Sequence, residues 1–170
     1  MATSGYLRKS MSSYFDFYIY WNVTSQSIAN NTSTVYLSWG TYKKKANTQT
    51  YNANSALTAK YGSTTLKNAS AVSFDMRNSS VGTETSLYNT TVTVNHNDDG
   101  TLNLYLYGYL NVGSLSLASS AEISGYAALP TIPRASGITA TNGYVGGSSN
   151  ITIDKKNADF TTTVSYKIAG

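Results

Sequence analysis

Alternation of apolar and polar side chains between Phe15 and Val23 constrains the fold of this chain more than any other feature. In an extended strand, successive side chains point to opposite faces, so a period of two residues gathers one kind of side chain on one face. The apolar face here comprises Phe15, Phe17, Ile19, Trp21 and Val23, and the other face comprises Tyr14, Asp16, Tyr18, Tyr20 and Asn22. The segment therefore predicts a long, half-buried β-strand.

Similar strand patterns recur along the chain and no helical period accompanies them. The further predicted strands are 35–39, 71–76, 87–94, 102–110 and 115–128. Charged residues make up only 12% of the chain, and its many Thr, Val and Tyr residues favour strands over helices. We predict an all-β protein, with an antiparallel β-sandwich of Greek-key or jelly-roll type over residues 14–128.

Turn chemistry is clearest at His96-Asn97-Asp98-Asp99-Gly100. An Asp-Gly pair supplies the positive φ that a tight turn requires, and alternating strands flank it on both sides. The segment predicts a β-hairpin.

Both prolines of the chain fall in Leu129-Pro130-Thr131-Ile132-Pro133-Arg134-Ala135-Ser136. Each proline fixes its own φ and keeps the preceding residue extended, so residues 129–136 are predicted to form a stiff linker. Residues 137–170 then read as a partial second β domain, with short strands at 138–141, 151–153 and 160–168. This part is too small to bury a core alone, so we expect a truncated product or a domain completed elsewhere. Residues 1–13 are predicted to be a flexible N-terminal arm.

Several protein classes are disfavoured by composition. The absence of cysteine excludes disulfides and thiolate metal sites. Residues 1–13 contain Arg8 and Lys9 but no apolar run, so no signal peptide is expected, and no apolar segment is long enough for membrane insertion. The net charge is +4, yet the basic residues are scattered except for Lys43-Lys44-Lys45, which argues against nucleic-acid binding. We interpret that lysine run as a solvated strand end or a protected sheet edge.

Residues able to carry chemistry are few. His96 is the only histidine, no Gly-x-Ser-x-Gly motif accompanies it, and its place beside a turn favours a structural role. Asp98 and Asp99 are weak candidates for a metal site, because turn-forming side-chain hydrogen bonds explain the same residues. We assign no catalytic residue and no cofactor.

Tyrosines are the most suggestive candidates for binding: the chain has fifteen of them. The predicted strands place Tyr18 with Tyr20, and Tyr105 with Tyr107 and Tyr109, on their outward faces. Tyrosine combines a flat apolar ring with a polar hydroxyl, which suits both subunit interfaces and stacking on sugar rings. The alternatives are a subunit contact, an ordinary sheet surface and a glycan contact.

Four segments carry a resemblance to a known family: Trp21 to Val35, Val94 to Thr101, Leu129 to Ser136 and Phe160 to Tyr166. Together they resemble the N-terminal part of a family of siphophage tail structural proteins from phages of Gram-positive hosts, catalogued as of unknown function. The Leu-Pro-Thr-Ile-Pro-Arg-Ala-Ser string is the most specific of them. The resemblance implies a virion protein of the tail tip, baseplate or fibre, and it transfers no catalytic residues.

Three functions remain in view. The first is a non-enzymatic, oligomeric phage tail protein that contributes to assembly and host adhesion, with other tail proteins and a host cell-wall glycan as partners. The second is a carbohydrate-binding module for cell-wall polysaccharide, and the least favoured is a cell-wall hydrolase domain. For the first, we expect synthesis in the host cytoplasm and a final location in the virion.

Overall fold

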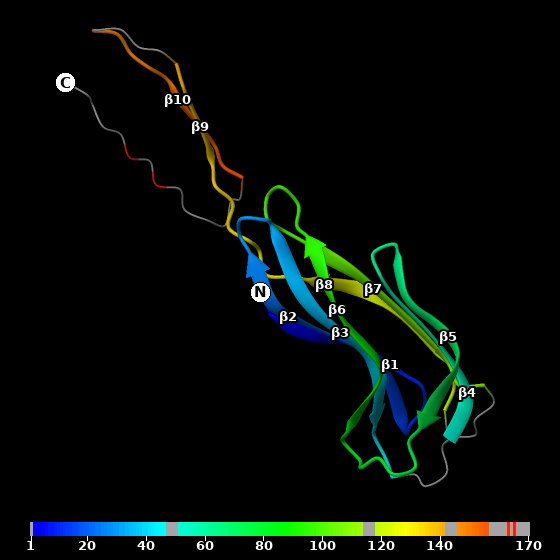
Figure 1. The fold of residues 1–170 in the computed structure, drawn as a ribbon. Helices are drawn as coiled ribbons and strands as arrows, with labels where there is room; N and C mark the ends of the chain where they lie inside the picture. Colours follow the sequence, from blue (N-terminus) through cyan, green and yellow to red (C-terminus); the bar gives the residue numbers. More distant parts are fainter. Residues whose placement is uncertain are drawn as a thin grey trace.

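The computed structural model describes residues 2–46, 51–113, 118–141 and 146–156, Thr163 and Ser165, and for Tyr51 and Ala53 the backbone only. This part of the chain forms ten strands and contains no helix, and so no helix able to cross a membrane (Figure 1). The strands are β1 (Ser4–Ser10), β2 (Phe15–Ser27), β3 (Thr32–Lys43), β4 (Tyr51–Tyr61), β5 (Thr64–Asp75), β6 (Glu84–Asn95), β7 (Asn103–Asn111), β8 (Ala121–Ala128), β9 (Gly137–Ala140) and β10 (Ile151–Asp154). The strand predicted at 160–168 lies outside the described residues except for two positions.

Eight of these strands form two four-stranded antiparallel sheets, which we call sheet A (β1-β2-β3-β6) and sheet B (β5-β4-β7-β8). The sheets face each other, as Figure 1 shows. The chain passes between them at the β3–β4, β5–β6 and β6–β7 connections. The predicted all-β class with antiparallel sheets is confirmed.

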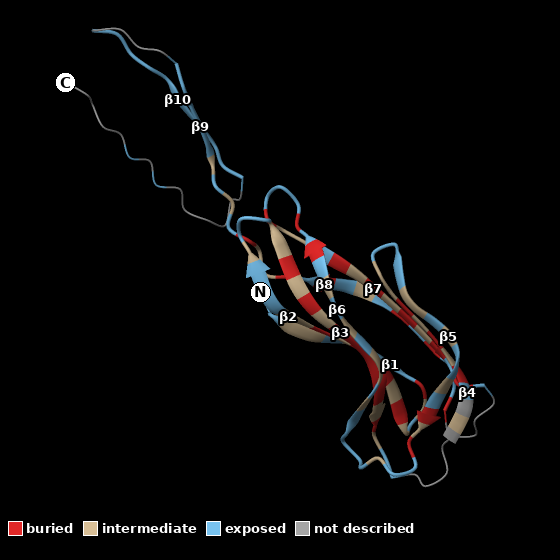
Figure 2. Cartoon of the chain, in the orientation of Figure 1, coloured by how far each residue is buried: buried red, intermediate tan, exposed pale blue. Residues whose placement is uncertain are grey.

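The core lies between the two sheets and consists of the alternating apolar side chains. Sheet A contributes Phe15, Phe17, Ile19, Trp21, Val35, Leu37 and Trp39, and sheet B contributes Leu57, Ala59, Leu104, Leu106, Leu110 and Ile123. The buried residues appear in Figure 2 as red bands that alternate with paler ones along the strands. Trp39 also links the sheets, because its Nε1–H donates a 3.0 Å hydrogen bond to the Tyr107 carbonyl oxygen.

The predicted flexible arm over residues 1–13 is wrong for most of its length. β1 pairs with β2 from Ser4↔Asn22 to Ser10↔Asp16, and Leu7 packs against the core. Pairing with the long first strand, rather than any apolar pattern of its own, makes this segment a strand.

The predicted hairpin at His96–Gly100 is also wrong, although the turn itself forms. The Gly100 N–H donates to the Asn97 carbonyl at 2.8 Å, and Gly100 has a φ of +81°. However, β6 pairs with β3 and β7 pairs with β4 and β8, so the turn carries the chain from sheet A to sheet B. The local turn chemistry was read correctly, but the next strand belongs to the other sheet.

The prediction of a solvated lysine run is wrong for Lys43, which is only 2% exposed, whereas Lys45 is exposed. Its Nζ donates hydrogen bonds of 2.8 Å to the Met76 carbonyl and 2.7 Å to the Ser79 carbonyl, which fixes the start of the β5–β6 connection. Lys44 forms a 2.6 Å ion pair with Asp16 on the neighbouring strand.

The segment Leu129–Ser136 follows β8 and docks on the end of the sandwich. Leu129 and Ile132 are 1% and 0% exposed. The Ile132 N–H donates to the Gly100 carbonyl at 2.9 Å, and Arg134 Nη1 donates to the Ile28 carbonyl at 3.0 Å. The segment thus joins the β2–β3 and β6–β7 turns.

Beyond this segment, β9 and β10 pair, within the described part of the chain, only with each other and extend away from the sandwich (Figure 1). Every residue of both strands is exposed. Ile138, Ile151 and Ile153 are 44–53% exposed, and Ile138 lies opposite Ile153.

Candidate functional site

The tyrosines predicted to form binding surfaces lie on two opposite faces of the sandwich. Tyr18 and Tyr20 belong to β2 in sheet A, whereas Tyr105, Tyr107 and Tyr109 belong to β7 in sheet B. The odd-numbered residues of β2 and the even-numbered residues of β7 face the core. The tyrosines lie at the alternate positions, so they point outward. They therefore form two separate candidate surfaces.

On sheet A, a row of tyrosine rings crosses three strands. The ring centroids of Tyr6 and Tyr20 are 4.8 Å apart, and those of Tyr20 and Tyr36 are 6.3 Å apart. Tyr6 is 45% exposed, and the other two are partly exposed. We call these three residues the tyrosine row. It presents adjacent aromatic surfaces on a rigid sheet.

Tyr18 does not belong to the exposed surface, because it is only 3% exposed. It lies opposite Gly40 on β3, where a Cβ atom would come within 2.5 Å of the Tyr18 hydroxyl. Its ring also contacts that of Tyr6 at 5.9 Å, edge to face. Burial raises the pKa of Tyr18. Tyr18 thus supports the tyrosine row from below and is unavailable to a ligand.

A charged clamp holds the exposed end of the row in place. Arg8 on β1 forms a 2.6 Å ion pair with Glu84 on β6, spanning the two strands between them. The guanidinium lies 4.6 Å from the Tyr6 ring centroid and 4.8 Å from that of Tyr42. The Tyr6 hydroxyl also donates to Glu84 at 3.1 Å; partial burial and this carboxylate raise the pKa of Tyr6. The clamp orders Tyr6 before any partner arrives.

The second surface, on sheet B, combines rings with charges. The centroids of Tyr105 and Tyr126 are 5.4 Å apart, and Tyr126 is 69% exposed. Lys60 Nζ lies 5.4 Å from the Tyr107 ring centroid. Partial burial and the nearby Glu122 carboxylate raise the pKa of Tyr107. This face, like the tyrosine row with its Arg8–Glu84 pair, offers aromatic and charged groups together.

The only histidine holds the end of the sandwich together. One nitrogen of His96, Nδ1, lies 2.7 Å from the Gly100 carbonyl oxygen, which can only accept, so Nδ1 carries the hydrogen. The other, Nε2, lies 2.7 Å from the Ser33 hydroxyl. The side chain is 7% exposed, and both ring nitrogens are occupied. This geometry gives His96 a structural role.

The two aspartates of the turn differ in their surroundings. Asp99 Oδ1 accepts hydrogen bonds from the Thr101 hydroxyl at 2.7 Å and from the Thr101 N–H at 2.9 Å, which lower its pKa. These are the turn bonds that the sequence suggested. Among the described residues, no three acidic or histidine side chains gather around a point that could hold a metal ion.

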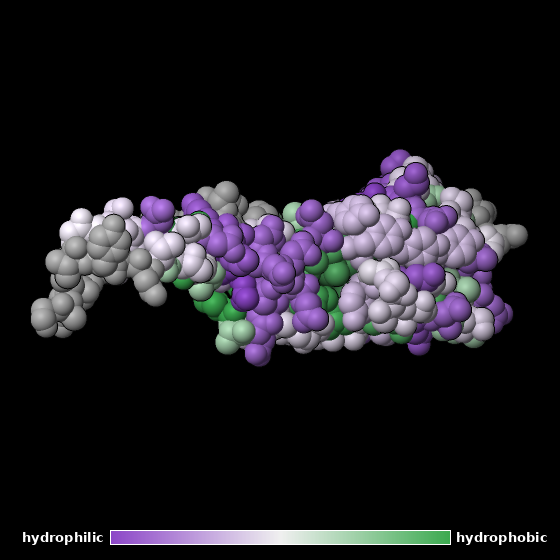
Figure 3. All heavy atoms as spheres, turned by 90° about the horizontal axis from the view of Figure 1, so that it is seen from above, coloured by the Kyte–Doolittle hydropathy of each residue, from purple (hydrophilic) through white to green (hydrophobic). Residues whose placement is uncertain are grey.

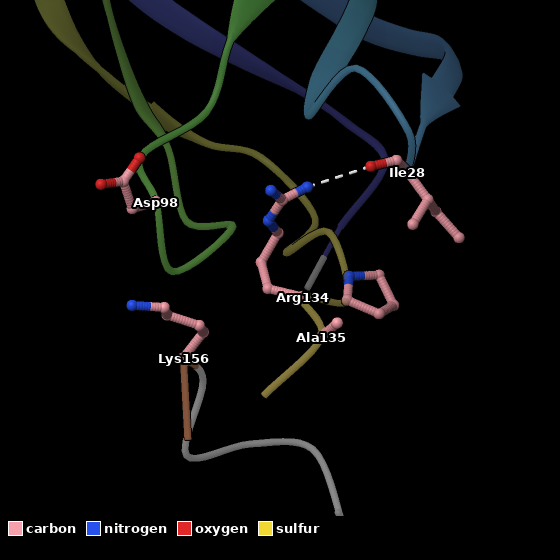
Figure 4. Close-up of a pocket in the computed structure, with 6 residues that line it drawn as sticks. Ile28, Asp98, Arg134, Ala135 and Lys156 are labelled. Carbon is pink, nitrogen blue, oxygen red and sulfur yellow. Dashed lines mark hydrogen bonds between the residues drawn. The ribbon is translucent and has the colours of Figure 1, made fainter. Parts of the chain in front are cut away.

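Asp98 instead lines a cleft of about 290 Å³ between the turn, the Leu129–Ser136 segment and Lys156. Arg134 lies between Asp98 and Ile28 in Figure 4, with its hydrogen bond to the Ile28 carbonyl drawn. Lys156 forms a 2.8 Å ion pair with Asp154, which raises the pKa of Lys156. The cleft is thus lined by one acidic and two basic side chains.

Comparison with known proteins identifies the family. The model of the family described as "Siphovirus protein of unknown function (DUF859)" matches residues 12–170. The chain belongs to this family. No curated protein and no solved structure matches it.

For this siphovirus protein, sequence reasoning missed Tyr6, Tyr36 and Tyr126 as surface candidates. Tyr6 was assigned to a flexible arm, and its position became clear only from the pairing of β1 with β2. Tyr36 and Tyr126 follow the same outward alternation as the predicted tyrosines, so extending that signal to every strand would have found them.

The face of the molecule drawn in Figure 3 is mostly polar. Figure 3 shows one face, where hydrophilic purple and near-neutral pale atoms cover most of the described residues. Hydrophobic green atoms appear only in small areas between them. A large apolar patch of the kind that marks obligate interfaces is not visible on this face.

Proposed function

We propose that this siphovirus protein is a non-enzymatic structural component of the phage tail that contributes to assembly and to adhesion at the host surface. The family match supports a phage structural protein. The two-sheet sandwich supplies rigid outer faces, and on both of them tyrosines reach the surface. A protein of this kind acts by presenting surfaces.

The proposed lack of catalysis is supported by how the ionisable groups are used. His96 is engaged through both ring nitrogens. Several carboxylates have basic neighbours instead of a second carboxylate: Asp16 pairs with Lys44, Asp75 with Arg77 and Glu84 with Arg8. A glycosidase instead requires two carboxyl groups facing each other across the substrate.

The observation that supports a role in adhesion is the tyrosine row. Sugar rings have apolar faces edged by hydroxyl groups, and a tyrosine ring with its polar hydroxyl complements both features. Rings on three adjacent strands form an extended platform, and the clamp at Tyr6 reduces the entropy lost on binding. We infer that the platform contacts a polysaccharide of the host cell wall.

The test is binding of the labelled chain to purified cell walls from a panel of Gram-positive bacteria. The Tyr20→Ala, Tyr36→Ala double variant removes two rings of the row, and each stacking contact contributes on the order of 1 kcal/mol, so binding should weaken at least about tenfold. The matched control, Tyr107→Ala with Tyr126→Ala, removes two rings from the opposite face and should bind as the wild type does. Equal loss in both variants, or none in either, would refute the assignment of the row.

A carbohydrate-binding module with no part in virion assembly is the alternative, and the same tyrosine row favours it. Mass spectrometry of purified virions separates the two, because only a structural component is present in every particle. A third measurement addresses catalysis: release of reducing sugar ends from the walls by the purified chain would overturn the proposal that it is not an enzyme.

A further inference from the structure

The sandwich has four edge strands, and three of them carry features that oppose pairing with another chain. β1 is short and contains Arg8 and Lys9. β5 contains Lys67, pairs irregularly with β4 and has Ala71 at a φ of +60°. β8 contains Glu122 and Gly125. Charges, irregular pairing and short length are the usual protections of a sheet edge.

β6 differs from the other edges. It is twelve residues long and pairs, among the described residues, only with β3. Its first part is protected: the register shifts between Ser86 and Tyr88, and Lys67 lies 5.8 Å from the Tyr88 ring centroid. The second part, Asn89–Asn95, continues in regular register without a charge, a glycine or a proline. This part is an unprotected sheet edge.

The neighbourhood of this edge is open. A cleft of about 320 Å³ runs beside its last residues and is lined by Thr93, Val94 and Asn95 together with the β4–β5 turn. Thr91, Thr93 and Asn95 are exposed. The backbone groups along the free side of a strand are therefore accessible to an added strand, which is a common mode of protein association.

We propose that a second copy of this chain pairs antiparallel with Asn89–Asn95, so that the two A sheets become one continuous sheet. This goes beyond the proposed function, because it names the surface by which copies join and does not depend on glycan binding. A second copy is the favoured occupant because the segment complements itself: it has no charge that would meet its like across a two-fold axis.

The pleat fixes the register of this pairing. Val92 and Val94 face inward with Thr90, while Asn89, Thr91 and Thr93 face outward, and residues opposite each other across two strands must share a face. A two-fold axis that passes beside Val92 and relates the two copies satisfies this rule and pairs every residue of the segment. Val92 then meets its own copy, and Thr91 meets Thr93 of the second copy, both of which are favourable cross-strand pairs.

The contact between the two paired Asn89–Asn95 segments, which we call the seam, is expected to be weak. Asn89–Asn95 spans about 24 Å at the usual rise per residue. A contact one strand wide and of this length buries less surface than the roughly 800 Å² per partner of a standard interface. We therefore expect a dimer that dissociates on dilution. A high local concentration of the chain would favour the dimer.

Two measurements on the full chain test the proposal. In sedimentation equilibrium over a concentration series, Thr91→Lys should raise the dimer dissociation constant at least about tenfold, since the two lysines approach across the seam. Thr65→Lys, at an exposed position on the β5 edge, is the matched control and should leave the constant unchanged. Circular dichroism checks that both variants are folded.

The second measurement uses the absence of natural cysteines. Under mild oxidation Val92→Cys should form a disulfide-linked dimer, because residues opposite each other in an antiparallel pair come close enough for a disulfide. Val72→Cys, on the β5 edge with the same partial burial, should crosslink far more slowly. A wild-type chain that stays monomeric throughout the series, equal effects of both lysines or faster crosslinking at Val72 would overturn the proposal.

Discussion

Replacement of Gly100 by alanine should release the Leu129–Ser136 segment from the sandwich. Gly100 has a φ of +81°, and a Cβ atom there would lie 1.9 Å from the Ile132 carbonyl oxygen. That oxygen belongs to backbone held by the 2.9 Å hydrogen bond from the Ile132 N–H to the Gly100 carbonyl. The backbone of Ile132 must therefore move when the methyl group is added.

Gly82→Ala provides the matched control. Gly82 has a similar φ of +85°, but nothing lies within 4 Å of its added Cβ, so it reports only the cost of an alanine at positive φ. That cost is about 1–2 kcal/mol at either position. At Gly100 the variant also loses a hydrogen bond worth about 1 kcal/mol and part of the burial of Ile132, worth about 1.5–3 kcal/mol. Gly100→Ala should thus destabilise the protein by about 2–4 kcal/mol more than Gly82→Ala.

Urea unfolding of the wild type and both variants, followed by tryptophan fluorescence, measures this difference. Equal loss of stability in the two variants would show that the contact between Gly100 and Ile132 does not hold the segment, and the reasoning would fail.

Two further perturbations test the core and the surface charges. Gly108→Ala places a Cβ atom 2.7 Å from Trp39 Cδ1 between the sheets, and this overpacking should cost about 1–3 kcal/mol in urea unfolding. Hydrogen bonds from Arg77 lower the pKa of Asp75 to about 2, so the stability this carboxylate contributes is present above pH 4 and is lost as the pH falls toward 2. Asp75→Asn should flatten that part of a plot of melting temperature against pH; an unchanged slope would contradict the assignment.

The alternation of apolar and polar side chains was sufficient to predict the core strands, because burial of one face requires an apolar side chain at every second residue. It could not predict β1, whose single large inward side chain is Leu7. That strand forms by pairing with the edge of β2 opposite β3, a property of the sheet and not of residues 4–10. Pairing partners distant in sequence leave no local signal.

The same limit explains the error at His96–Gly100. Asn, Asp and Gly determine that the chain turns, whereas the partner of β6 is decided by which strands compete for it. In the sheet, β3 pairs with β2 on one side and offers its other side to β6. The turn therefore connects the two sheets, and the Gly100 carbonyl oxygen accepts hydrogen bonds from both His96 and Ile132.

For the tyrosine surfaces, the sequence predicted direction but not exposure. Tyr18 and Tyr20 point outward together, yet only Tyr20 reaches the surface. Tyr18 fills the space above Gly40 and is covered by Tyr6, and both neighbours come from other strands. Exposure on a sheet face depends on the sizes of cross-strand neighbours, which can be read only once the register is known.

The boundary of the folding unit is the point where the structure and the sequence-based scheme lead to different predictions. The sequence placed the end of the sandwich at 128 and a linker at 129–136. Leu129 and Ile132 are fully buried in the sandwich, whereas all described residues of β9 and β10 are exposed. A chain ending at residue 136 should therefore unfold within about 0.5 kcal/mol of the full chain, because none of the described residues after 136 belongs to the core.

A chain ending at residue 128 loses both buried side chains, each worth about 1.5–3 kcal/mol, and leaves the Gly100 carbonyl without its bond from Ile132. It should be less stable by about 3–6 kcal/mol in urea unfolding. If the two shortened chains were equally stable, residues 129–136 would be a linker in the ordinary sense. If the 128-residue chain is the weaker, the segment is the last structural element of the sandwich, and its two prolines serve to hold Leu129 and Ile132 extended for burial.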